Sequence, residues 1–148
     1  MSTPRAVVVD TNVVVAGLLT ADPSSPTAVV LDGMLGARFV FLLSELLLAE
    51  YRAVLLRPAI RDRHRLAEAE VDELLAEIVR NGIVRSPRRS AKSAPDTNAP
   101  DRHDQHLWDL ACSEPGAVLI TGDLELAENP PVEVRVLSPR ELVGLLDP

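Results

Sequence analysis

The chain has 148 residues, of which 47% are hydrophobic and 25% charged, and its formal net charge is −7. A chain of this size forms one compact domain and buries about two-thirds of its unfolded surface, so it needs no disulfide or metal ion to hold a core. Its single cysteine excludes an internal disulfide and indicates a reducing compartment. No apolar stretch approaches the roughly 20 residues of a membrane span. We therefore expect a cytoplasmic protein in which residues 1–148 form a single domain.

Apolar, strand-like segments alternate with helical ones along the chain. Strands are predicted at 6–10, 39–43, 83–84, 117–121 and 132–137, and helices at 26–37, 45–57, 66–81, 101–114 and 138–146. Ser44 and Ser138 are suited to begin helices as N-caps, Pro58 ends one helix, and Gly82 follows another at the usual C′ position. This alternation predicts an α/β fold: a three-layer α/β/α sandwich around a central, mostly parallel sheet.

Two basic segments contrast with the acidic composition of the chain. They are residues 57–65 and 85–92, and the second belongs to a polar loop, 85–100, that is rich in Arg, Ser and Pro. Each segment alone is typical of a solvated loop or helix face, but together they leave room for a local anionic partner. The candidate contacts to such a partner are Arg57, Arg61, Arg88 and Arg89.

Two aspartates stand where predicted strands end. Asp10 ends the first strand, and Asp123 lies just beyond the strand at 117–121. The carboxyl ends of parallel strands meet at one edge of a sheet, where ligand sites gather. Either aspartate alone could be an ordinary turn or N-cap residue, but the pair predicts a site at this edge.

Two further carboxylates lie on helix faces that we expect to point inward. Glu50 has Leu46 and Ala53 among its neighbours one turn away, and Asp104 is followed by apolar residues at helical spacing, with Asp101 one turn before it. An unpaired buried carboxylate costs several kcal/mol or takes up a proton. A cluster of four is therefore best explained by a shared divalent cation.

The donors in this cluster are hard oxygens, which favours Mg²⁺ or Mn²⁺ over Zn²⁺. Such ions suit phosphate chemistry, because they activate a bound water and stabilise the charge that develops on oxygen. Thr11 and Asn12, which interrupt the apolar run after Asp10, can orient the carboxylates or the attacking water. Simple turn and capping chemistry also explains the same two residues, and both roles can hold together.

Four segments, in this order, resemble the PIN domain: VVVDTNVVVAGLL, SELLLAEYRAVLLRP, DRHDQHLWDLA and LITGD. They look most like the VapC-like toxins of bacterial type II toxin–antitoxin pairs, and the likeness covers essentially the whole chain. The resemblance implies a Mg²⁺- or Mn²⁺-dependent endoribonuclease, a homodimer and a protein antitoxin. It assigns the catalytic, metal-binding set to Asp10, Glu50, Asp104 and Asp123, polar supporting roles to Thr11, Asn12 and Thr121, and an accessory role to Asp101.

Some features depart from the family pattern or leave other functions open. His103 and His106 flank Asp104 outside the pattern and are read as solvent-facing rather than as a metal pair. An Asp-based phosphotransfer domain would need a lysine near the site, and the only lysine is Lys92, in the polar loop. A nucleotide-binding module would need a glycine-rich loop that is absent. A non-catalytic PIN-fold module that binds a protein partner remains the main alternative to the nuclease.

Overall fold

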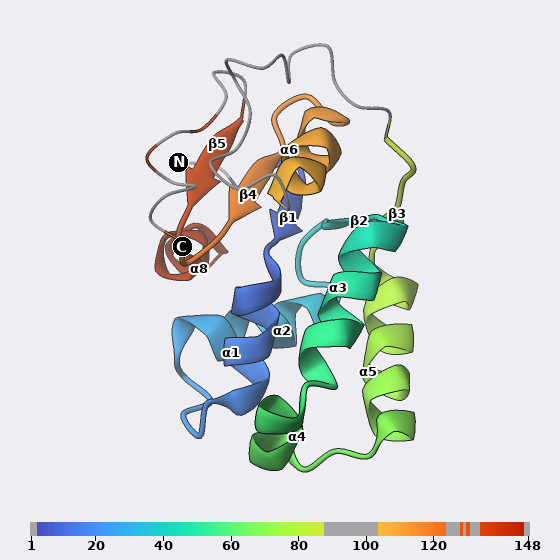
Figure 1. The fold of residues 1–148 in the computed structure, drawn as a ribbon. Helices are drawn as coiled ribbons and strands as arrows, with labels where there is room; N and C mark the ends of the chain where they lie inside the picture. Colours follow the sequence, from blue (N-terminus) through green and yellow to red (C-terminus); the bar gives the residue numbers. More distant parts are fainter. Residues whose placement is uncertain (1–2, 88–103, 124–127, 129, 131–133, 147–148) are drawn as a thin grey trace.

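The computed structural model describes residues 3–87, 104–123, 128, 130 and 134–146. Strands β1 (Val7–Val9), β4 (Val118–Ile120) and β5 (Arg135–Leu137) form a sheet in the order β1-β4-β5, and β2 (Leu42–Leu43) pairs with β3 (Ile83–Val84). A bridge between Val7 and Phe41 joins the two groups. Every pairing among the described strands is parallel. The predicted α/β/α architecture is therefore confirmed (Figure 1).

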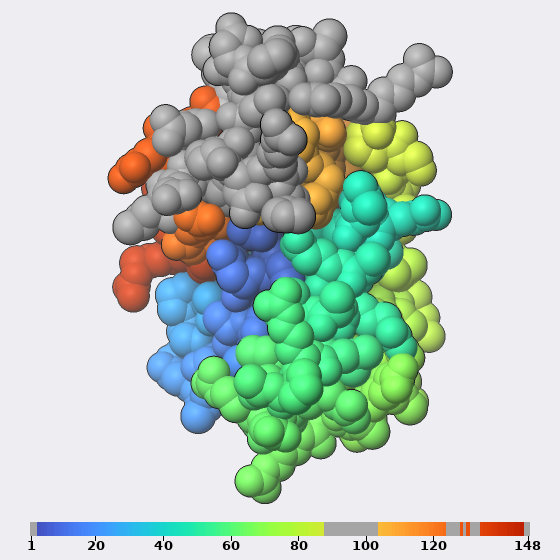
Figure 2. Space-filling model, viewed as in Figure 1, coloured from blue at the N-terminus to red at the C-terminus, as the bar shows by residue number. Residues whose placement is uncertain are grey.

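The helices surround these strands. They are α1 (Thr11–Leu19), α2 (Pro26–Leu35), α3 (Glu45–Leu55), α4 (Pro58–His64), α5 (Glu68–Asn81), α6 (Gln105–Cys112) and α8 (Pro139–Leu146). Helix α6 packs on β1, β2 and β4, whereas α8 packs on β5 and α2. Helices α1, α3 and α4 contact one another, and their side chains share the face of the molecule seen in Figure 2.

Two of these helices, α1 and α4, were not predicted from the sequence. The β-branched residues after Asp10 are poor helix formers, but Asp10 has an extended backbone and its side chain accepts a hydrogen bond from the Thr11 amide at 2.8 Å. Burial of Val13, Val14 and Val15 then outweighs their weak helix propensity. Pro58, which was expected only to end a helix, also occupies the first turn of α4, where a missing N–H costs nothing.

The predicted caps of two helices are confirmed. The Ser44 hydroxyl accepts from the Leu47 amide at 3.1 Å at the start of α3. At the start of α8, the Ser138 hydroxyl accepts from the Glu141 amide at 3.1 Å, and the Glu141 carboxylate accepts from the Ser138 amide at 3.0 Å. This reciprocal pair is a capping box, which fixes the first turn of a helix.

Two glycines are required by close packing. Gly82 follows α5 as predicted, but its backbone is extended (φ −101°, ψ 176°) rather than left-handed. A Cβ there would lie 2.6 Å from the Phe41 ring, so the position needs a small residue for space. A Cβ on Gly17 of α1 would lie 2.5 Å from the carbonyl oxygen of Thr27, so Gly17 lets α1 and α2 approach closely.

The core is built from large side chains of the strands and of the helices that pack on them. The fully buried side chains include Trp108, Tyr51, Phe41 and Met34. Within the described ranges, no helix combines the length and apolar character that crossing a membrane requires. The rigid packing of this core holds the ends of β1 and β4 in fixed positions, and these ends begin the candidate site.

Candidate active site

The carboxyl ends of β1 and β4 place Asp10 and Thr121 side by side. Asp10 is only 7% exposed. One of its carboxylate oxygens accepts from the Thr11 amide at 2.8 Å, and the other accepts from the Thr121 hydroxyl at 2.7 Å. The same hydroxyl oxygen of Thr121 accepts from the amide of Asp123 at 3.0 Å. Thr121 therefore links the two strand-end aspartates and fixes the orientation of Asp10.

Glu50 reaches the site from α3. The Thr11 hydroxyl donates to one oxygen of the Glu50 carboxylate, and Nε2 of His106 lies 3.5 Å from the other. The predicted inward face of this helix needs correction, because Leu46 is 65% exposed and Ala53 is also exposed. The buried face consists of Leu47, Tyr51 and Leu55, so Glu50 stands at its margin.

One cavity of about 780 Å³ brings the predicted acids together. Its lining includes Asp10, Glu50, Asp104 and Asp123, together with Thr11 and Asn12. Asp104 lies immediately before α6, as its N-cap residue. Helix α6 ends at Cys112, earlier than the predicted helix at 101–114. The structure therefore gathers four carboxylates from separate segments of the chain around one cavity. Thr121, which was also predicted to support the site, donates its hydroxyl hydrogen bond to the Asp10 carboxylate.

The charges in the cavity act on one another. Burial raises the pKa of Asp10 above its ordinary value of 3.8, the hydrogen bonds from Thr121 and Thr11 oppose this rise, and the charges of Glu50 and Asp123 add to it. Tyr51 lies beneath the site and donates to the carbonyl oxygen of Val9 at 2.5 Å. Burial, followed by the charges of Asp10 and Glu50, raises the pKa of Tyr51 well above 10.0, so its hydroxyl remains a donor.

The other predicted residues lie partly in this cavity and partly outside it. Arg57 lines the cavity with the acids, whereas Arg61 lines a neighbouring cavity on α4. His106 is not solvent-facing as predicted, because it is largely buried and contacts Glu50. Asp101, His103, Arg88, Arg89 and Lys92 lie outside the described residues. The arginine that the sequence reasoning did not single out is Arg63, which also lines the cavity. No signal in the sequence places it there, because its position depends on how α4 packs beside the cavity.

The donor set fits a divalent cation in its chemistry, because it offers carboxylate oxygens of the kind that Mg²⁺ and Mn²⁺ prefer. Across the part of the chain that the structure describes, however, no three Asp, Glu, His or Cys side chains are grouped closely enough to hold one ion. Holding a shared ion would therefore require some of the carboxylates to rotate. Glu50 and Asp104 are only half-buried, which leaves space for such a rotation.

The comparison with protein families agrees with this geometry. The PIN domain model matches residues 6–125, and the chain therefore belongs to the PIN domain family. The matched range contains all four acids that line the cavity. PIN domains are commonly nucleases and typically use divalent metal ions. No curated protein matches the chain.

Proposed function

We propose that this protein is a Mg²⁺- or Mn²⁺-dependent endoribonuclease. The observation that carries the proposal is the convergence of Asp10, Glu50, Asp104 and Asp123 on one cavity at the carboxyl edge of a parallel sheet. The mutual repulsion that contributes to the raised pKa of Asp10 is what a bound cation would relieve. Neither Asp10 nor Glu50 is neutralised by an arginine in the described structure.

The side chains have separate roles in this proposal. Asp10, Glu50, Asp104 and Asp123 would hold the ion, and Thr11 and Thr121 would keep the first two carboxylates oriented. The exposed amide of Asn12, at the cavity wall, is available to a phosphate oxygen. When bound, a divalent ion supplies an acidified water for in-line attack on the phosphodiester and stabilises the charge on its oxygens.

The test compares two substitutions that remove the same charge. Asp10→Asn should lower Mn²⁺-dependent cleavage of RNA more than about a hundredfold, beyond the 10–100-fold typical of residues that only support a ligand. Asp32→Asn, on the exposed face of α2, should leave cleavage unchanged. Millimolar Mn²⁺ should raise the Tm of the parent and not that of Asp10→Asn, because binding to the folded state stabilises it.

An unchanged Tm in Mn²⁺, together with cleavage that survives chelation or the Asp10→Asn change, would contradict the proposal. Affinity for a protein partner that is indifferent to Mg²⁺, without any cleavage, would instead support a non-catalytic binding module.

We further propose that the chain acts as a VapC-like toxin, forms a homodimer and is neutralised by a protein antitoxin. This finer proposal is supported by the four motifs that resemble those toxins. Expression of the parent in bacteria should arrest growth, whereas Asp10→Asn should not. Co-expression of a small neighbouring gene that encodes a DNA-binding protein should relieve the arrest, and failure of the parent to arrest growth would count against the toxin role.

A further inference from the structure

A groove separate from the candidate active site runs along α4 and α5. It consists of two cavities, of about 780 Å³ beside α4 and about 750 Å³ beside α5. Leu66 and Glu70 line both cavities, so the two adjoin at the segment that joins the helices. Neither cavity shares a lining residue with the one that the four acids line. We call this surface the α4–α5 groove, and the proposed nuclease chemistry does not account for it.

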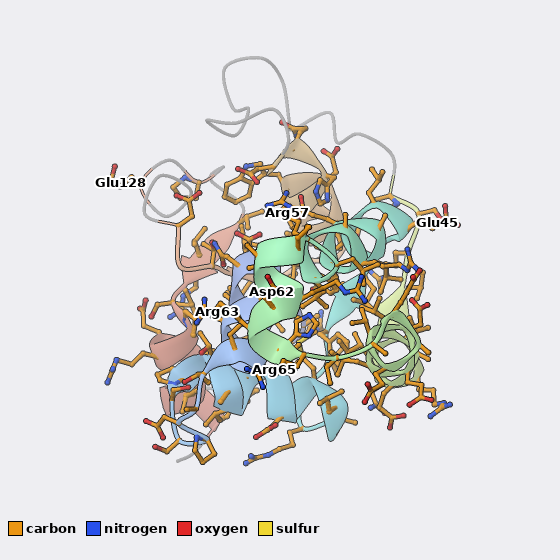
Figure 3. All side chains as sticks on the ribbon, turned by 60° about the horizontal axis from the view of Figure 1, so that its bottom comes forward. Glu45, Arg57, Asp62, Arg63, Arg65 and Glu128 are labelled. Carbon is orange, nitrogen blue, oxygen red and sulfur yellow. The ribbon has the colours of Figure 1, made fainter. Side chains whose placement is uncertain are left out.

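The end of the groove at α4 carries positive charge. Arg61 and Arg65 line this end, both are exposed, and Asp62 lies between them in the sequence. Figure 3 shows Asp62 on α4 and Arg65 where the chain leaves this helix for α5. Within the described residues, neither arginine forms an ion pair. Both guanidinium groups are therefore available to the carboxylates of another molecule.

The end of the groove at α5 carries negative charge. Glu70, Glu73 and Glu77 follow one another at intervals of three and four residues, which places them along one side of the helix. Glu77 forms an ion pair with Arg80 at 2.5 Å, and Glu70 accepts from the amide of Ala67 at 3.0 Å. Glu73 is exposed and forms no ion pair in the part of the chain that the structure describes. This end therefore keeps an excess of negative charge.

Apolar side chains lie between the charged ends and beside them. Leu66 is half-buried where the two cavities adjoin, and Leu35 of α2 and Leu74 of α5 are half-buried along the α5 end. Apolar side chains surrounded by charged ones are the usual composition of a protein–protein interface. Opposite charges at the two ends also make the groove complementary to a copy of itself, because two antiparallel copies bring each basic end to an acidic end.

We propose that the α4–α5 groove is the surface through which two copies of this chain form a dimer. The two-fold axis crosses the groove at Leu66, which packs on the Leu66 side chain of the second copy. Arg61 and Arg65 of each copy then lie opposite Glu73 and Glu77 of the other, so the same contacts occur twice. Complementary charges fix the register of such an interface, since the parallel arrangement would bring like charges together.

This inference rests on the homodimer of the proposed function and assigns a surface to it. Helix α4 and the residues at its ends contribute to both the groove and the candidate active site, but through different side chains. Arg57 and Arg63 line the cavity of the four acids, whereas Arg61 and Arg65 line the groove. Each copy in the dimer therefore keeps its own complete set of acids.

The test reverses the charge at one end of the groove at a time. Self-association of the full chain is measured by sedimentation equilibrium at fixed salt, in the presence of a chelator. Arg61→Glu with Arg65→Glu makes both ends acidic, and Glu73→Arg with Glu77→Arg makes both ends basic. Each double variant should raise the dissociation constant of the dimer more than about a hundredfold, because like charges then meet at both ends.

A mixture of the two double variants separates loss of charge complementarity from loss of folding. An acidic groove then faces a basic one at both ends, so the mixture should form a heterodimer although each variant alone is monomeric. The chain that carries all four changes has its ends exchanged but still complementary, and it should dimerise again. Variants that had merely lost their fold would recover in neither case, and the Tm of each is measured in parallel.

The matched controls reverse charges outside the groove. Glu45→Arg on α3 and Arg140→Glu on α8, both at exposed positions, should leave the dissociation constant within about twofold of the parent, because distant surface charges are screened by salt.

The inference is overturned if the parent dimer persists in both double variants, or if the two variants do not associate when mixed. In either case the homodimer itself stands and another surface forms it. A monomeric parent would overturn both the surface and the homodimer. Cleavage of RNA is measured separately, so failure of the nuclease proposal is distinguishable from each of these results.

Discussion

Asp10 and Glu50 line the same cavity but are held in different ways. Asp10 stands at the end of a buried strand, is 7% exposed, and has a hydrogen bond to each carboxylate oxygen. Glu50 stands on a helix at the margin of the core, and its side chain is 31% exposed. The strand end therefore provides a fixed, desolvated carboxylate, whereas the helix provides one that retains contact with solvent.

The difference shows which contacts hold the site in place. Burial raises the pKa of Asp10, so its charge is maintained at a cost that the Thr121 and Thr11 hydrogen bonds partly offset. Two interactions connect α3, the helix that carries Glu50, to the rest of the protein. One is the buried hydrogen bond from Tyr51 to Val9, and the other is the exposed ion pair between Arg52 and Asp72. Removal of the Thr121 hydrogen bond at the strand end should have the largest effect on stability, removal of the Tyr51 hydrogen bond a smaller one, and removal of the Arg52–Asp72 ion pair the smallest.

The largest effect is expected at Thr121. Thr121→Val keeps the shape of the side chain but removes the hydroxyl that donates to the buried Asp10 carboxylate, which should lower the free energy of unfolding by about 1–3 kcal/mol. The hydrogen bond stabilises the charged form of Asp10. Without this bond the pKa of Asp10 should rise further, so the loss should be fully present above the pKa of Asp10 in the variant and should shrink as the pH falls from there through the pKa in the parent.

Urea denaturation in the presence of a chelator, followed by the fluorescence of the buried Trp108, measures this effect. Thr121→Ser, which keeps the hydroxyl, is the control. An equal loss in Thr121→Ser and Thr121→Val would show that the methyl group, rather than the hydrogen bond to Asp10, is what matters.

A smaller effect is expected at Tyr51. Tyr51→Phe keeps the buried ring but removes the hydrogen bond to the Val9 carbonyl, which should cost about 0.5–1.5 kcal/mol in unfolding free energy. Because the pKa of Tyr51 is raised well above 10.0, the loss should be independent of pH throughout the neutral range. A marked pH dependence between neutral and weakly alkaline conditions would contradict the proposed protonation state.

The smallest effect is expected at Asp72. The hydrogen bond from Arg52 lowers the pKa of Asp72 below 3.8, so the pair contributes stability above that value and loses it as the pH falls through the lowered pKa. Asp72→Asn should therefore lower the Tm slightly at neutral pH, by less than Tyr51→Phe, and not at strongly acidic pH. A decrease in Tm as large as that of Thr121→Val would show that the exposed ion pair stabilises the protein as much as the buried hydrogen bond does.

The sequence predicted the parallel α/β architecture because its strands are short apolar runs bounded by clear caps and breakers. Ser44 and Ser138 act locally, through their own hydrogen bonds, and so they could be recognised without the structure. The helix after Asp10 could not be predicted from the sequence, because its β-branched side chains favour a strand. Only burial against other elements reverses this preference.

The candidate acids could be selected from the sequence because carboxylates at strand ends, and on helix faces expected to point inward, are unusual, although the inward face expected around Glu50 was wrong. The structure places all four on the lining of one cavity, and their role as metal ligands stays a prediction. What lay beyond the sequence was long-range geometry. The contact of His106 with Glu50 and the position of Arg63 beside the acids both depend on how α3, α4 and α6 pack, and no local spacing encodes this packing.

Gly17 determines a property of the cavity without lining it. Because it has no side chain, α2 lies directly against α1, and Thr27 is carried to the wall of the cavity. A methyl group at this position would wedge the two helices apart and displace that wall. The width of the opening thus depends on a residue that is not itself part of the lining.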